Sequence, residues 1–202
     1  MSAFNPNFRP FWGTIAFISL FFIALSHIFF QQYLFMRPCA NCVYIRFALS
    51  IIAFGAIFAL ISPRIFRFFG ILFLIYGEIF GIKYALLLND IHKALKSDDI
   101  FGVAGCDIVM KFPFGIEFDK LFAPLFAPTG DCGDDAPVVP RGEVLSDLQA
   151  YFVDLYQNGW YLVPKYQFID MAQASLIIFA LIAIFALCGI VLRMILKLGK
   201  FF

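Results

Sequence analysis

Apolar residues along the chain gather into four long runs, each close to the length that crosses a bilayer. The runs cover about residues 11–30, 43–61, 68–88 and 172–195. A helical span of the hydrocarbon core needs roughly 20 apolar residues, and its backbone polar groups must be satisfied within the segment. The pattern therefore predicts an all-α integral membrane protein, in which residues 1–202 form a single membrane domain built on a bundle of four transmembrane helices.

Two polar segments, at about residues 31–42 and 89–171, lie on one side of this predicted bundle. Four spans place both termini on the other side, where most basic residues near the span ends are found: Arg9, Arg64, Arg67, Arg193, Lys197 and Lys200. Because positive charge near span ends marks the cytoplasm, we expect cytoplasmic termini and periplasmic polar segments. No small-residue cleavage site follows the first run, so it is interpreted as a retained span rather than a signal peptide.

The long polar segment is acidic. It holds thirteen of the fourteen Asp and Glu residues and six Lys and Arg residues, a net charge of −7, whereas the whole chain carries +1. This charge indicates either a solvated exported loop or a surface that steers a basic partner. A short amphipathic helix is predicted near residues 143–157, either in the membrane surface or capping the bundle. Its apolar face comprises Val144, Leu148, Tyr151, Phe152 and Leu155.

Cysteines are the main candidates for chemistry. Four of the five fall in the outer segments: Cys39, Cys42, Cys106 and Cys132. Cys188 lies inside the fourth run, where we expect a buried apolar residue without chemistry. Zinc sites usually combine two close cysteine pairs, and haem attachment needs a His directly after the second cysteine, where this chain has Val43. Neither a metal nor a haem site is therefore expected.

The close pair suits redox chemistry better than a structural role. A bridge between Cys39 and Cys42 would constrain almost no loop, whereas a bridge between Cys106 and Cys132 would be a structural staple worth about 3–4 kcal/mol in the chain-entropy model. Cys42 is expected near the start of a helix, where unpaired N–H groups favour a thiolate. Arg46 follows four residues later on the same helical face, although an arginine reaching the lipid headgroups is the alternative.

Two stretches of sequence carry a resemblance to a known family. They are FFQQYLFMRPCANCVYIR at residues 29–46 and CDIVMKFPFGIEFDKLFAPLFAPTGDC at residues 106–132. Together with matches from about Trp12 onward and in the last helix, they resemble the DsbB family. Its members are bacterial inner-membrane enzymes that reoxidise the periplasmic dithiol oxidase DsbA with ubiquinone or menaquinone. The order and spacing of both cysteine pairs make this resemblance more specific than a single Cys-x2-Cys motif.

The resemblance implies a role for each outer cysteine in a protein-dithiol:quinone oxidoreductase. Cys106 would be attacked by a thiolate of the partner oxidase, and Cys132 would leave and then exchange with Cys39. Cys42 would be freed as the thiolate that reacts with the quinone cofactor. The residues implied in quinone binding are Arg46, Gln31 and His92.

The chain departs from the family pattern at three points. Ile45 stands where the family often has an acidic residue beside the arginine, which removes one proton acceptor. Glu78 and Lys83 lie inside the third run, where a charge needs a partner, protonation or a route to the surface. The stretch after Cys132 is longer than in short family members. Long loops occur in the DsbI branch, whose dedicated partner DsbL is basic.

Two alternative functions remain at this point. The vitamin K epoxide reductase family also places a four-helix bundle, a loop cysteine pair and a Cys-x2-Cys motif beside a quinone. In that family the loop pair precedes the Cys-x2-Cys motif, whereas here the order is reversed. A non-enzymatic membrane scaffold would instead hold two structural disulfides that do not exchange. The order of the motifs favours the DsbB family.

Overall fold

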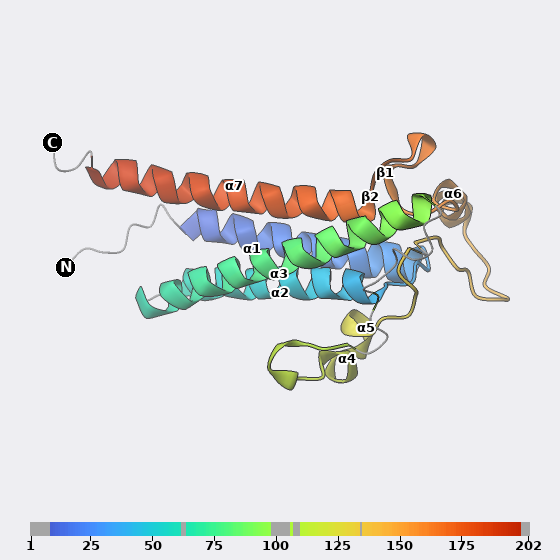
Figure 1. Cartoon of the computed structure of the whole chain (residues 1–202), viewed down its shortest axis with the longest axis horizontal. Coiled ribbons are helices and arrows are strands. Elements are labelled where there is room, and N and C mark those ends of the chain that lie inside the picture. Colours follow the sequence, from blue (N-terminus) through green and yellow to red (C-terminus); the bar gives the residue numbers. More distant parts are fainter. Residues whose placement is uncertain (1–8, 62–63, 98–105, 107–109, 134, 199–202) are drawn as a thin grey trace.

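The computed structural model is a bundle of four long helices with the shorter elements gathered at one end (Figure 1). It describes residues 9–61, 64–97, 106, 110–133 and 135–198. Within these residues, the helices long and apolar enough to cross a membrane cover Arg9–Tyr33, Ala40–Ile61, Phe66–Lys96 and Met171–Gly189. The predicted all-α, multi-pass membrane architecture is confirmed.

The first three spans are built from four consecutive elements. Helix α1 (Arg9–Ala24) continues into the π-helix η2 (Leu25–Tyr33), and α2 (Ala40–Ile61) and α3 (Arg64–Lys96) follow. The outer segment then contains η4 (Pro113–Gly115), α4 (Phe118–Leu121), α5 (Ala123–Phe126) and α6 (Asp147–Leu155). Strands β1 (Tyr161–Val163) and β2 (Phe168–Asp170) pair antiparallel around η5 (Pro164–Tyr166) and lead into α7 (Met171–Leu198).

Helices α2 and α3 pack closely because small residues meet where they cross. A Cβ added at Gly70 would lie 2.6 Å from the Gly55 carbonyl oxygen and 2.9 Å from the Ala59 Cβ. Lipid tails are as apolar as leucine, so helices in a membrane associate largely through such close packing. This contact fixes α2, which carries the Cys-x2-Cys motif at its outer end.

Two helices differ from the prediction in ways that matter for the site. Helix α3 extends to Lys96, about eight residues beyond the predicted run. The last turns of α3 are amphipathic, with Leu88 and Ile91 buried and Lys93 exposed. The run of apolar residues in the sequence therefore ends before the helix does. The outer third of the first span is a π-helix, which the hydrophobic pattern does not predict.

Cys188 is exposed, so the expectation that it would be buried was wrong. The buried residues of α7 recur at helical spacing, as Ala172, Phe179, Ile182 and Ala186 show. Cys188 lies two residues beyond the last of these, and its side chain therefore leaves the helix on another face. High hydrophobicity of a whole span does not distinguish its packed face from its outer face.

An aromatic cluster holds the first half of the outer segment against α2. Phe112, Phe118 and Phe126 surround Phe47 of α2, with ring centroids 5.0, 5.2 and 6.0 Å away. The Lys111 N–H also donates a hydrogen bond of 2.6 Å to the hydroxyl of a tyrosine on α2. Aromatic pairs of this kind stabilise a structure beyond the apolar area that they bury. The segment is thus anchored before the chain reaches Cys132.

Helix α6 lies against the outer end of the first span. Phe152 packs edge-on against Phe29 at 5.6 Å, and Gln149 Nε2 donates a hydrogen bond of 2.7 Å to the Tyr33 carbonyl. These contacts favour the capping interpretation of the predicted helix. The other side of this region is apolar and exposed: Val144, Leu148 and Tyr151. That these exposed apolar side chains lie in the membrane surface stays a prediction.

Asp170 forms the N-cap of α7. Its carboxylate accepts a hydrogen bond of 3.0 Å from the Gln173 N–H, and Gln173 Oε1 accepts one of 3.3 Å from the Asp170 N–H. This reciprocal arrangement is a capping box. Burial raises the pKa of Asp170, but the Gln173 N–H and the Lys96 ammonium oppose it and hold the pKa below its usual range.

The close contact between α2 and α3 can be tested by adding one methyl group. Gly70→Ala should lower the free energy of unfolding by about 1–3 kcal/mol, because the neighbours of the new Cβ include backbone that cannot move aside. Gly13→Ala is the matched control, since no atom lies within 4 Å of its added Cβ. Thermal or denaturant unfolding in detergent would measure both, and equal stability of the two variants would contradict the proposed close packing.

The cap at Asp170 predicts a pH-dependent contribution to stability. Asp170→Ala should lower the free energy of unfolding at neutral pH by roughly 0.5–2 kcal/mol, and Asp170→Asn by less, since Asn can still cap. A depressed folded pKa stabilises the protein above the unfolded value of about 3.9. The difference between wild type and Asp170→Ala should therefore shrink as the pH falls through the lower folded pKa. A difference that stays constant in acid would contradict this account.

Candidate active site

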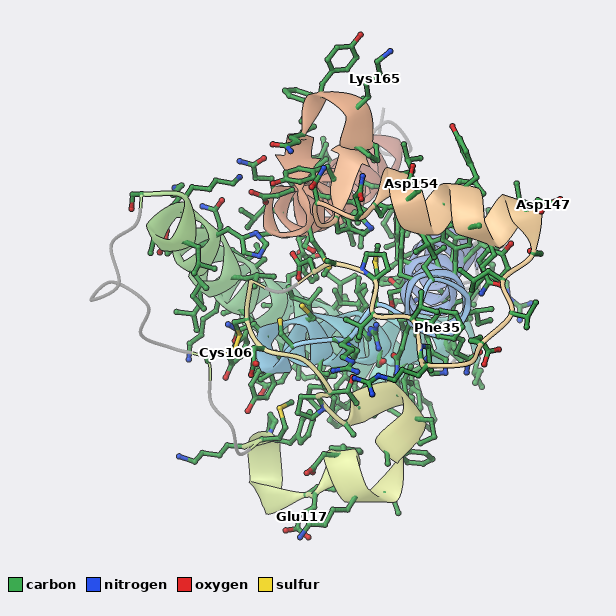
Figure 2. The ribbon with its side chains drawn as sticks, turned by 90° about the vertical axis from the view of Figure 1, so that its right-hand side faces the viewer. Phe35, Cys106, Glu117, Asp147, Asp154 and Lys165 are labelled. Atoms are coloured by element: carbon green, nitrogen blue, oxygen red, sulfur yellow. A yellow bond between two sulfur atoms is a disulfide. The ribbon has the colours of Figure 1, made fainter. Side chains whose placement is uncertain are left out.

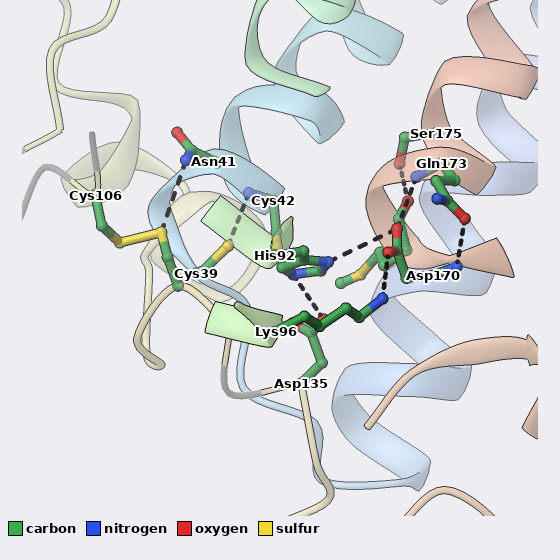
Figure 3. A network of polar contacts seen from close by, with 12 residues as sticks. Cys39, Asn41, Cys42, His92, Lys96, Cys106, Asp135, Asp170, Gln173 and Ser175 are labelled. Atoms are coloured by element: carbon green, nitrogen blue, oxygen red, sulfur yellow. Dashed lines mark hydrogen bonds and ion pairs between the residues drawn. A yellow bond between two sulfur atoms is a disulfide. The ribbon is translucent and has the colours of Figure 1, made fainter. Parts of the chain in front are cut away.

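The outer cysteines meet at the start of α2 (Figure 3). Cys106 and Cys132 form a disulfide, whereas Cys39 and Cys42 are buried free thiols. Cys132 packs against the core cluster that includes the two thiols, and Asn41 Nδ2 lies 3.7 Å from the Cys132 sulfur. Two pairs that are 63 or more residues apart in the sequence thus form one site.

A backbone clamp places Cys132 beside the Cys-x2-Cys motif. The Thr129 and Gly130 N–H groups both donate to the Pro38 carbonyl, at 2.9 and 3.2 Å. Pro38 directly precedes Cys39, and Gly130 lies two residues before Cys132. The two hydrogen bonds therefore fix the register between the outer segment and the start of α2.

The clamp depends on a close approach of two backbones. A Cβ added at Gly130 would lie 2.7 Å from the Arg37 carbonyl oxygen, so a larger residue would push the segments apart. Phe35 has a left-handed backbone with φ of 56°, which is uncommon for a residue other than glycine. Its carbonyl accepts a hydrogen bond of 3.1 Å from the Val138 N–H. The outer segment thus supports the turn that leads from η2 into α2.

The helix start contacts the sulfur of Cys39. The Cys42 N–H donates to the Cys39 sulfur at 3.2 Å, in the manner of a side chain that caps a helix. Unpaired N–H groups at a helix start favour negative charge. The sequence analysis expected the N–H groups at the helix start to favour a thiolate at Cys42. In the structure, the Cys42 N–H contacts the sulfur of Cys39 instead.

A cavity of about 380 Å³ lies beside Cys42. Cys42 and Arg46 lie in its wall, one helical turn apart on α2. Most other wall residues are apolar or aromatic and come from the first span, α2, the region after α6, and α7: Phe22, Phe30, Leu49, Tyr156, Trp160 and Phe179. A mostly apolar cavity with a few polar groups is typical of a site for a small organic molecule. This one suits a small, mostly apolar molecule with a polar group that Arg46 can bind.

Arg46 is only 6% exposed and is held by the π-helix. It donates one hydrogen bond to Gln31 Oε1 and another, of 3.1 Å, to the Ser26 carbonyl. Gln31 Nε2 in turn donates to the Pro124 carbonyl at 3.2 Å. Both acceptors of Arg46 are neutral, so its charge is not cancelled by them. A buried guanidinium held in this way can bind an anionic or strongly polar oxygen.

Gln31 and His92 are not among the residues that line the cavity, but each contacts one that is. Gln31 orients Arg46, which does face the cavity. His92 is buried, and its Nε2 lies 3.2 Å from Oδ2 of Asp135, which is a wall residue. Direct contact of either residue with a bound molecule stays a prediction.

The wall residues that the sequence analysis did not find include three with polar or aromatic side chains from the outer segment: Asp135, Tyr156 and Trp160. Asp135 is one of many acidic residues in its segment, and nothing local marks it as buried. Trp160 and Tyr156 pack edge-on against Phe30, with centroids 5.5 and 6.0 Å away. The predicted amphipathic helix gave the only signal for any of them, because Tyr156 lies within its predicted range, directly after the end of α6 in the structure.

Glu78 and Lys83, the two charged residues of the third apolar run, are not among the residues that line this cavity. Glu78 is 7% exposed, and among the described residues its carboxylate oxygens have no hydrogen-bond partner. Lys83 Nζ lies 5.3 Å from the centroid of the Tyr84 ring, a distance suited to a cation–π contact. Neither residue belongs to the cavity wall.

Comparisons with known proteins cover most of the chain. The sequence model of the family described as disulfide bond formation protein DsbB matches residues 8–189. The protein-disulfide oxidoreductase DsbI of Salmonella typhimurium is 45% identical over 172 residues, which cover 82% of this chain and 76% of that protein. DsbI of Escherichia coli is 43% identical over 180 residues, which cover 86% and 81%. The chain therefore belongs to the DsbB family of disulfide bond formation proteins.

Proposed function

We propose that this protein is a membrane thiol:quinone oxidoreductase that reoxidises a periplasmic, thioredoxin-fold dithiol oxidase of the DsbA type. The observation that carries the proposal is the docking of the Cys106–Cys132 disulfide at the start of α2, where Cys42 and Arg46 face one cavity. The names of the DsbI relatives support a protein-disulfide oxidoreductase. Electrons would pass from the partner through the loop disulfide and the Cys-x2-Cys pair to a quinone.

The first exchange takes place at the loop disulfide. A partner thiolate attacks Cys106, forms a mixed disulfide, and releases Cys132 as a thiolate. The Asn41 side-chain N–H group, 3.7 Å from the Cys132 sulfur, favours negative charge on that sulfur. A second thiolate of the partner then displaces Cys106, so the partner leaves with a disulfide and the loop pair gains two electrons.

The second exchange passes those electrons to the Cys-x2-Cys pair. The clamp at Pro38 keeps Cys132 beside Cys39, so the Cys132 thiolate can attack the Cys39–Cys42 disulfide at Cys39. Cys42 leaves, and Cys106 then displaces Cys39 to restore the loop disulfide. The oxidised loop pair and free Cys39 and Cys42 thiols of the structure correspond to the state after this exchange.

The cavity residues fit a quinone head group, either ubiquinone or menaquinone. A bound quinone would supply a two-electron acceptor that is soluble in lipid. The aromatic side chains of Phe30, Tyr156 and Trp160 would cover the ring and exclude water. The guanidinium of Arg46, oriented by Gln31, would donate to a ring oxygen. The Cys42 sulfur lies in the same wall and gives up electrons as the Cys39–Cys42 disulfide forms.

We infer a bacterial inner-membrane location with cytoplasmic termini and periplasmic cysteine loops. Helix α1 begins and α7 ends at the same end of the bundle, and α2, which directly follows Cys39, begins at the opposite end (Figure 1). The basic residues near the inner ends of the spans support the cytoplasmic side, and Lys200 among them lies outside the described residues. The acidic segment would then face the periplasm.

The acidic outer end favours a basic partner oxidase, such as one similar to DsbL. Asp147 and Asp154 project from α6 at this end (Figure 2), and Asp131 is exposed directly beside Cys132. Four further acidic residues of the segment lie outside the described residues: Asp98, Asp99, Asp107 and Asp134. Complementary charge raises the rate of encounter between partners more than it raises affinity.

Quinone reduction by the purified protein in detergent tests the proposed function. With a reduced thioredoxin-fold oxidase as donor, wild type should turn over and Cys42→Ser should not. Arg46→Ala should raise the quinone KM about 10- to 100-fold, since a hydrogen bond to a charged group contributes roughly 1.5–3 kcal/mol. Disulfide exchange between the donor and Cys106–Cys132 should be unchanged in Arg46→Ala.

Arg141→Ala is the control, because Arg141 is exposed and lies outside the cavity wall. Absence of wild-type turnover with several donors and quinones would support a stapled membrane scaffold instead. Equal losses of disulfide exchange and quinone use in Arg46→Ala would contradict its assignment to the quinone step.

Salt dependence tests the preference for a basic partner. Oxidation of a basic donor should slow several-fold as ionic strength rises, because the screening length falls from about 30 Å at 0.01 M salt to about 3 Å at 1 M. A neutral DsbA-type donor should be oxidised more slowly than the basic donor at low salt. Its rate should change little as the salt concentration rises. The double change Asp147→Asn and Asp154→Asn should reduce the advantage of the basic donor. Equal rates for both donors, independent of salt, would rule out electrostatic selection.

A further inference from the structure

His92 lies between two buried carboxylates at the outer end of α3 (Figure 3). Its Nε2 is 3.2 Å from Asp135 Oδ2, and its Nδ1 is 3.7 Å from Asp170 Oδ1. The three side chains are 7%, 8% and 5% exposed. Lys96 Nζ lies 3.2 Å from Asp170 Oδ2 and is 56% exposed. The network therefore extends from the surface at Lys96 to Asp135 in the cavity wall.

Quinone reduction in the cavity needs protons as well as electrons. A quinone takes up two electrons and two protons to become a hydroquinone. In the exchange steps proposed above, each sulfur attacks and leaves as a thiolate, so the two protons of the partner's thiols pass to water at the outer surface. Two protons must therefore reach the ring oxygens from that water, and the mostly apolar cavity wall requires a polar route for them.

We propose that His92 and Asp135 form a proton route from the outer surface to the cavity, with Lys96 and Asp170 at its surface end. The proposal rests on the proposed quinone reduction. A histidine ring can accept a proton at one nitrogen and release one at the other. The two nitrogens of His92 face opposite ends of the network, and Asp135 completes the route at the cavity wall.

The position of Asp135 matters because α2 itself offers no carboxylate beside Arg46. The preceding residue, Ile45, is apolar and cannot carry a proton. Asp135 presents a carboxylate to the same cavity from the outer segment. Its position follows from the clamp at Pro38, which fixes the segment only a few residues earlier.

A purely structural network would behave differently from a proton route. In that case the contacts would only hold the outer segment to α3 and α7. Weakening them would then disturb Cys132, three residues before Asp135, and would slow disulfide exchange as well as quinone reduction. Asp135→Asn and His92→Gln retain polar side chains of similar size, and Asp170→Asn retains a capping group for α7.

A single-turnover experiment separates these alternatives. Protein with reduced Cys39 and Cys42 would be mixed with a short-chain ubiquinone analogue, and hydroquinone formation would be followed by absorbance. Asp135→Asn and His92→Gln should slow this step at least about tenfold, with a larger loss at higher pH, where protons are scarcer. Imidazole in the buffer should restore part of the rate. Asp131→Asn, an exposed carboxylate in the same segment, should behave as wild type.

A second measurement needs no quinone. The chain contains two histidines, so nitrogen-15 labelling of histidine gives two sets of ring signals, and His27→Gln identifies those of His92. The route requires that the His92 signals and their pH dependence change in Asp135→Asn and in Asp170→Asn. They should not change in Asp131→Asn.

The outcomes distinguish this inference from the function on which it rests. Wild-type rates of hydroquinone formation in both Asp135→Asn and His92→Gln would overturn the route. Equal slowing of disulfide exchange and hydroquinone formation would also overturn it, in favour of a structural network. If wild type forms no hydroquinone, the proposed function fails and the route fails with it. If wild type forms hydroquinone, but the His92 signals in Asp135→Asn and Asp170→Asn are the same as in wild type, only the route fails.

Discussion

The site depends on the two hydrogen bonds that the Pro38 carbonyl accepts from the outer segment. Each bond alone is worth only about 0.5–1.5 kcal/mol, but their position matters more than their strength. They fix the segment at Gly130, so Cys132 reaches the start of α2 and Asp135 reaches the cavity. Because Gly130 lies against the Arg37 backbone, this register needs a residue without a side chain. One contact thus positions both the Cys106–Cys132 disulfide and the Asp135 carboxylate in the cavity wall.

A second constraint is the charge of Arg46 in a largely apolar environment. Burying a guanidinium is unfavourable unless its N–H groups have acceptors, and Gln31 and the Ser26 carbonyl provide them. A carboxylate partner would satisfy the same groups but would also neutralise the charge. Neutral acceptors orient the side chain and leave its field directed at the cavity and at Cys42. The π-helix is part of this arrangement, because it carries both acceptors at the height of Arg46.

How much the sequence predicts depends on whether a feature is local. The four spans were predicted because each must satisfy its own backbone in lipid, and the Cys-x2-Cys motif and Arg46 were found because they are adjacent in the sequence. The amphipathic end of α3 and the exposure of Cys188 were missed, since average hydrophobicity does not identify a packed face. Asp135 and Trp160 could not be found, because only the docking of the outer segment brings them to the cavity.

The region after α6 contributes both to the cavity wall and to the start of α7. Tyr156 and Trp160 pack against Phe30 and line the cavity beside it, so the residues that cover the outer end of the first span also form part of the cavity wall. Asp170, at the end of that region, both starts α7 and faces His92. A mostly apolar wall keeps water from a buried sulfur, but it also offers few groups that can carry a proton. Among the described residues, the contacts of Lys96, Asp170, His92 and Asp135 form a polar connection from the surface to that wall.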